Sequence, residues 1–136
     1  MRRFFLLIVL AATICSCVRP SSTETFIPVD GADFGMYRYE LDLTDSLATY
    51  DLSFYTRVDG AVPGMLCLDV TWTSPVGDTF GETVYMHTGD SNGACEAYRT
   101  GVSPRMAGIW KLDVNIPDAP EGLRGLGLVC KRNGTR

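Results

Sequence analysis

Hydrophobic and polar residues alternate along much of this chain with a period of two. Successive side chains of a β-strand point to opposite faces, so this pattern predicts strands with one buried and one solvated face. Four segments show it, with the apolar positions Tyr37, Tyr39, Leu41 and Leu43; Tyr50, Leu52, Phe54 and Val58; Leu66, Leu68, Val70 and Trp72; and Trp110, Leu112, Val114 and Ile116.

Short segments rich in Gly, Pro, Asp and Asn separate these strands, as in Asp59-Gly60 and over 75–78 and 117–120. A further strand is predicted over 82–86, and no segment shows a capped helical pattern. Residues 90–106, with their glycines, charges and Pro104, are expected to make a long excursion over the surface. The predicted fold class is all-β, an antiparallel β-sandwich of about seven or eight strands.

The N-terminal residues 1–17 have the layout of a bacterial lipoprotein signal. Two arginines precede an apolar run over 4–14, which is too short for a spanning helix of about 20 residues. Cleavage before a lipidated cysteine requires a small preceding residue, and Ser16 meets this requirement for Cys17, whereas a bulky isoleucine precedes Cys15. We therefore predict lipidation of Cys17. The alternative is an ordinary secretory signal that leaves a soluble exported protein.

This assignment divides the chain into three parts. They are a signal peptide over 1–16, a lipidated N-terminus and polar tether over 17–25, and a β-sandwich domain over 26–136 that is large enough for one hydrophobic core. The formal net charge is −4, and loss of the two signal arginines makes it more negative. A nucleic-acid partner is therefore not expected, and membrane contact is expected through the N-terminal lipid anchor.

The sequence offers few residues for catalysis or metal binding. The lone His87 follows a predicted strand and reads as an exposed strand-end residue, and no nucleophile elbow is present. Residues 90–93 with Glu96 supply oxygens near a glycine but lack the spacing of a calcium loop. We expect no catalytic residue, no metal site and no cofactor. Among Cys67, Cys95 and Cys130, one disulfide and one spare thiol are compatible with an oxidising compartment, with three pairings open.

Aromatic residues and one short motif suggest binding or modification. Trp72 and Trp110 lie in phase with aliphatic residues, which favours core packing over ligand stacking. Tyr55 and Tyr85 fall on the polar phase and are the better candidates for a glycan-stacking platform. Asp45-Ser46-Leu47 resembles the O-glycosylation motif of exported Bacteroidota proteins, so Ser46 is a candidate acceptor; the alternative is a plain Asp-Ser turn.

Several short motifs between about residues 26 and 131 occur in the order found in one lipoprotein family. They are Asp45 with Tyr50-Asp51-Leu52, Phe54 and Arg57; Pro75-Val76-Gly77 with Thr83 and Met86; Tyr98 with Gly101-Val102; Gly108-Ile109-Trp110; and Leu123-Arg124-Gly125. In this order they resemble the GldH-type gliding motility lipoproteins of Bacteroidota. The chain departs from the family in a closing motif two residues short at 123–128 and in residues 58–64, which replace an aromatic-rich segment.

The resemblance implies a non-enzymatic outer-membrane lipoprotein tied to the gliding motility and type IX secretion apparatus. We expect an adaptor that binds a cell-envelope protein. Residues 18–22 lack the acidic run of a surface-export signal, which favours the periplasmic leaflet. The alternative is a glycan-binding lipoprotein of a polysaccharide-uptake system, and a small hydrolase is a third hypothesis.

Overall fold

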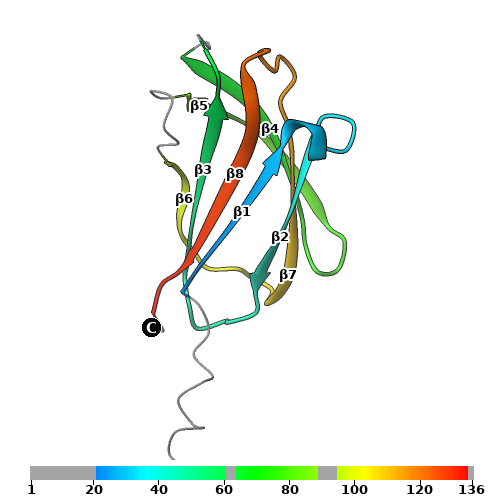
Figure 1. Ribbon diagram of the computed structural model, residues 1–136. Coiled ribbons are helices and arrows are strands. Elements are labelled where there is room, and N and C mark those ends of the chain that lie inside the picture. The colour runs from blue at the N-terminus through cyan, green and yellow to red at the C-terminus, as the bar shows by residue number, and fades with distance from the viewer. Residues whose placement is uncertain (1–20, 61–63, 89–94, 135–136) are drawn as a thin grey trace, which may run out of the picture.

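Eight β-strands make up most of residues 21–60, 64–88 and 95–134, which are the residues described by the computed structural model (Figure 1). A single 3-10 turn, η2 (Val29–Gly31), follows the first strand. The strands are β1 (Ser22–Pro28), β2 (Met36–Leu43), β3 (Tyr50–Val58), β4 (Met65–Thr73), β5 (Thr79–His87), β6 (Glu96–Val102), β7 (Gly108–Asn115) and β8 (Leu123–Arg132).

The strands form two four-stranded sheets that pack face to face. Sheet A has the order β1-β8-β3-β6 and sheet B the order β2-β7-β4-β5. All pairings are antiparallel. The predicted all-β class and the antiparallel sandwich are therefore confirmed, with β5 and β6 as the neighbouring edge strands of the two sheets (Figure 1).

The core lies between the sheets and is built from the alternating residues of each strand. In β2, buried and exposed positions alternate from Tyr37 to Leu43, as the sequence pattern predicts. The largest side chains with almost no exposure include Phe54, Leu52, Leu68 and Leu112, which come from both sheets. A strand that is apolar on one face only is stable when a second sheet covers that face, and this requirement produces the sandwich.

The domain begins earlier than the pattern of side chains indicates. β1 starts at Ser22, within the segment 17–25 that was expected to be a tether, and Ser22 pairs with Lys131 of β8. Residues 22–25 are exposed and polar, so they give no alternating signal. Main-chain pairing with β8, which does not depend on side-chain type, holds them in the sheet.

The expected surface excursion over 90–106 is wrong for its central part, because Glu96–Val102 forms β6 and pairs with β3. β6 is an edge strand with shifted register against β3, and most of its residues are exposed. A strand of this kind lacks regular alternation and resembles a loop in sequence. Among the described residues, no helix has the length and apolar character needed to cross a bilayer.

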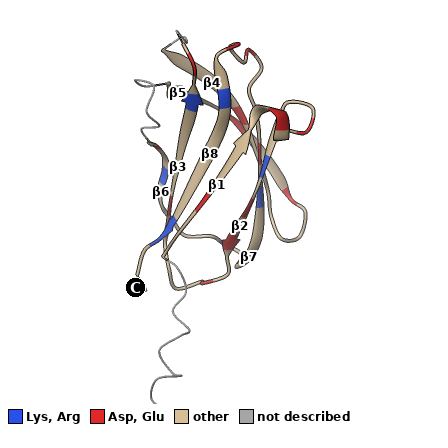
Figure 2. Cartoon of the chain, in the orientation of Figure 1, with Lys and Arg blue, Asp and Glu red and all other residues tan. Residues whose placement is uncertain are grey.

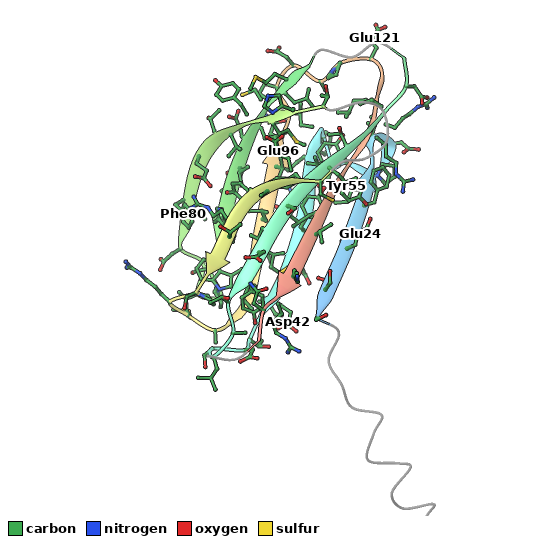
Figure 3. The ribbon with its side chains drawn as sticks, turned by 90° about the vertical axis from the view of Figure 1, so that its left-hand side faces the viewer. Glu24, Asp42, Tyr55, Phe80, Glu96 and Glu121 are labelled. Carbon is green, nitrogen blue, oxygen red and sulfur yellow. The ribbon has the colours of Figure 1, made fainter. Side chains whose placement is uncertain are left out.

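The sandwich has two distinct ends. The tether end contains the start of β1 and the end of β8, the β2–β3 and β6–β7 loops, and the β4–β5 turn. The distal end contains η2 and the β7–β8 loop. Figure 3 shows Asp42 near the tether end and Glu121 at the distal end. The acidic position of η2 is red in Figure 2.

Candidate functional site

An aromatic pocket opens between the two sheets at the tether end, beside edge strands β5 and β6. Its volume is about 720 Å³, which is within the range of small-molecule sites. The residues that decide its chemistry are Trp72, Phe80, Tyr98, Trp110, Arg99 and Arg105. Phe80 lies on β5 at the left of Figure 3, on the opposite side of the sandwich from Glu24 of β1.

Trp72 is the centre of the aromatic cluster that forms this pocket. Its ring stacks on Phe80, with centroids 5.9 Å apart and an interplanar angle of 8°. The ring centroid of Tyr98 on β6 lies 6.2 Å from that of Trp72, and Trp110 packs against Trp72 in a T-shaped arrangement with centroids 6.1 Å apart. Trp72 is only 3% exposed, whereas Phe80 is 51% exposed, so Phe80 presents a ring face to solvent at the mouth.

Hydrogen bonds to other groups of the protein occupy the polar atoms of these rings. Trp72 Nε1 donates to the Tyr98 hydroxyl at 2.9 Å, and that hydroxyl donates to Glu82 Oε1. Trp110 Nε1 donates to the carbonyl oxygen of Met106 at 2.9 Å. The donors of these rings are therefore already used, and the ring face that the cluster leaves most exposed to a ligand is that of Phe80.

Glu82 and Arg99 link β5 to β6 across the open side of the sandwich. One terminal nitrogen of Arg99 donates to both carboxylate oxygens of Glu82, at 2.6 and 2.7 Å. Burial alone would raise the pKa of the Glu82 carboxyl, but the hydrogen bonds from Arg99 and Tyr98 outweigh burial and lower it. Burial and the Glu82 carboxylate raise the pKa of Tyr98 to about 12. Glu82 is therefore a carboxylate that stabilises the structure by binding Arg99 and Tyr98.

A second exposed feature lies at the distal end, in the turn that leads into β2. Asp33 and Met36 exchange two main-chain hydrogen bonds of 3.0 and 2.9 Å around Phe34 and Gly35. Both central residues have positive φ, 52° for Phe34 and 78° for Gly35, as in a type I′ turn. The side chain of Phe34 is fully exposed.

Phe34 is an unfavourable residue for this position. The left-handed region costs a residue with a Cβ about 1–2 kcal/mol, and Asn, Asp or Gly is preferred there. No other non-glycine residue among the described ones has positive φ. Strain of this kind is concentrated at functional positions, and an exposed aromatic ring is a common anchor of protein interfaces.

Tyr55 and Tyr85, the two candidates for a glycan-stacking platform, lie on opposite outer faces of the sandwich and do not share one surface. Tyr85 is 64% exposed on sheet B, but Tyr55 on sheet A is only 5% exposed. The ring of Tyr55 lies against Gly127 and stacks on Phe26 with centroids 6.0 Å apart. Its hydroxyl donates to Glu24. The position of Tyr55 among the polar residues of its strand therefore did not make its ring accessible.

The two tryptophans were expected to pack in the core, and this is confirmed for Trp72. Trp110 is half-buried and packs against the core from its margin. Both rings also line the pocket, so core packing and a site for ligands are not exclusive here. Phe80 and Tyr98 were missed as site residues. Tyr98 lies in the segment that was expected to be a loop. Phe80 lies on an edge strand whose weak alternation gives no signal for a site residue.

The other candidate residues are separate from the pocket lining. Ser46 is exposed in the β2–β3 turn, where Asp45 Oδ1 accepts the Leu47 N–H at 3.0 Å. His87 ends β5, is exposed, and pairs with Glu96 at 3.2 Å. Cys17 and residues 90–93 of the calcium-like turn lie outside the described residues.

Cys67, Cys95 and Cys130 are free thiols, so the disulfide considered for them is not formed. Burial, followed by the charges of Asp42 and Asp51, raises the pKa of the Cys130 thiol to about 11. In the described part of the chain, no group of three or more His, Cys, Asp or Glu residues has a geometry that could hold a metal ion.

Comparisons with known proteins give little beyond the fold. No family model matches the chain, and no curated protein matches it significantly. A crystal structure of tripeptidyl peptidase 2 (TPP II) is similar, with a TM-score of 0.52 and 9% identity over 85% of this chain. The chain spans only 10% of that peptidase. At this identity the likeness concerns the fold alone, and the resemblance to gliding motility lipoproteins stays a prediction.

Proposed function

We propose that this chain is a non-enzymatic cell-envelope lipoprotein that acts as an adaptor for a partner protein. Phe34 carries this proposal. A fully exposed aromatic side chain occupies a turn position that disfavours it, and its ring is available to fill a pocket of a partner. The lipoprotein signal and the motifs that resemble gliding motility lipoproteins support a partner in the gliding motility or type IX secretion apparatus.

The proposed anchor and the sandwich together give Phe34 a defined orientation. Between a lipidated Cys17 and Ser22 the chain spans at most about 18 Å, so the tether end would lie near the bilayer. The nine residues of β3 extend about 30 Å from that end. The distal end, with Phe34, therefore faces away from the outer membrane into the periplasm.

A photo-crosslinking experiment in the producing bacterium tests the adaptor role. A photoreactive phenylalanine analogue replaces Phe34 in the full-length chain, and a matched variant carries it at Tyr85, another exposed aromatic position on the outer face of sheet B. We expect a defined cross-linked product with a cell-envelope protein from position 34 and none from position 85. No product from position 34, or the same products from both, would contradict the proposal.

Phe34→Asn separates binding from stability. Asn suits the left-handed turn, so this variant should be as stable as the parent protein or slightly more so, while co-purification of the cross-linked partner is lost. Tyr85→Asn is the matched control and should keep the partner. Retention of the partner by Phe34→Asn would show that Phe34 is not its anchor.

A further inference from the structure

We propose that the aromatic pocket at the tether end is a binding site for a short oligosaccharide that carries carboxylate groups, such as a chain of uronic acids. The site is independent of Phe34, which lies at the distal end, and the proposal does not depend on the adaptor role. It rests on the shape of the pocket, the state of its aromatic groups and the charge at its rim.

The shape of the pocket suits an elongated ligand. No main-chain pairing joins the two sheets at the β5 and β6 edges, where side chains such as Glu82 and Arg99 bridge them, and the cavity of about 720 Å³ opens beside this bridge. Phe80 stacks at 8° on the buried Trp72, so the exposed face of Phe80 is the one available to a ligand. A pyranose ring has a flat apolar face that packs on such rings, and its hydroxyl groups point outward to the polar rim.

The state of the aromatic groups also favours a sugar face over a ligand that needs deep polar contacts. The indole nitrogens of Trp72 and Trp110 and the hydroxyl of Tyr98 already donate within the protein. Polar recognition must therefore come from the rim, where the exposed Thr100 and Ser103 belong to the pocket lining. The lining thus combines aromatic and hydroxyl-bearing residues, which suit the apolar face and the hydroxyl groups of a sugar.

Charge at the rim defines the class of sugar. Arg99 and Arg105 both line the pocket, and the basic position on β6 in Figure 2 is Arg99. Glu82 neutralises Arg99, but Arg105 makes no ion pair with any described residue. The rim thus keeps one uncompensated guanidinium on a chain of net charge −4. A guanidinium binds a carboxylate through two parallel hydrogen bonds, so the ligand is expected to be acidic.

Calorimetric titration of the full-length protein in detergent tests this site. The probes are trimers of galacturonic acid and of mannuronic acid, with the neutral trimers of galactose and mannose as matched ligands. We expect saturable binding of at least one acidic trimer, about tenfold or more tighter than its neutral counterpart, as one charge-assisted hydrogen-bonded pair provides. Absence of binding by both acidic trimers, or equal binding of acidic and neutral trimers, would overturn the proposal.

Two variants locate the binding. Arg105→Gln should reduce the affinity for the acidic trimer to that for the neutral one, and Phe80→Ala should weaken both several-fold. Arg38→Gln and Tyr85→Ala, which alter an exposed arginine and an exposed tyrosine on the outer face of sheet B, are the matched controls and should leave binding unchanged. Thermal unfolding of each variant verifies the fold. Binding that both pocket variants retain in full would place the ligand elsewhere and refute the assignment.

Discussion

The ring of Tyr55 lies flat across Gly127, and only a glycine fits beneath it. A Cβ on Gly127 would lie well inside van der Waals contact with three atoms of this ring. Gly127 pairs with Tyr55 on one side and with Phe26 on the other, and the Tyr55 and Phe26 rings stack at 16°. The glycine thereby gives sheet A a covered aromatic patch on its outer face.

Gly127→Ala should therefore destabilise the protein by about 1–3 kcal/mol, the usual cost of overpacking. The added methyl group forces Tyr55 away from Phe26 and breaks its hydrogen bond to Glu24. Urea denaturation measures the loss. Because the clash is with the Tyr55 ring, the same substitution in a Tyr55→Ala background should cost much less; an equal cost in both backgrounds would refute this account.

The two tryptophans of the pocket should differ in their contribution to stability. Trp72→Ala removes a ring that is 3% exposed and should cost about 3–5 kcal/mol. Trp110 is half-buried and lines the pocket, so Trp110→Ala should cost about half as much. Chemical denaturation of both variants gives the comparison. A larger loss for Trp110→Ala would show that Trp110 is the principal core tryptophan.

The protein should lose stability between about pH 10 and pH 12. Burial and the Glu82 carboxylate raise the pKa of Tyr98 to about 12, and burial and Glu24 raise that of Tyr55 to about 12. Burial also raises the pKa of Tyr39 well above its ordinary value. Above pH 10 the unfolded chain releases tyrosine protons that the folded chain retains, so the free energy of unfolding falls as pH rises.

Thermal unfolding at intervals from pH 8 to pH 12 measures this dependence. Tyr98→Phe should be less stable at pH 8, because it loses the bonds to Glu82 and Trp72, and should show a shallower decline at high pH. Tyr85→Phe alters an exposed residue and should reproduce the parent profile. Identical slopes for the parent protein and Tyr98→Phe would exclude Tyr98 as a contributor.

Lipidation should depend on Cys17 alone. Cys17→Ser is expected to release the protein from membranes and abolish labelling by an alkynyl fatty acid, whereas Cys15→Ser keeps both properties. The reason is the small Ser16 before Cys17 and the bulky Ile14 before Cys15. Label that persists in Cys17→Ser and disappears in Cys15→Ser would reverse the cleavage assignment.

The sequence by itself determined the fold class and most of the core. Period-two alternation in residues 37–43, 50–58 and 66–72 reflects one strong physical constraint, because a strand that is apolar on one face must bury that face. Such strands are visible without knowledge of their neighbours. The turns are visible for a similar local reason, since Gly, Pro and Asp favour backbone conformations that end strands.

Only the tertiary structure decided which side chains meet. β1 and β6 are edge strands held by main-chain pairing, which leaves little trace in side-chain order. The pocket joins Trp72 of one sheet to Tyr98 of the other, and Tyr55 is covered because Gly127, distant in sequence, lies beneath it. Strand register decides whether a residue on the polar phase, such as Tyr55, is buried. Sheet packing decides which aromatic residues meet at an open edge. Both are long-range properties of the folded chain.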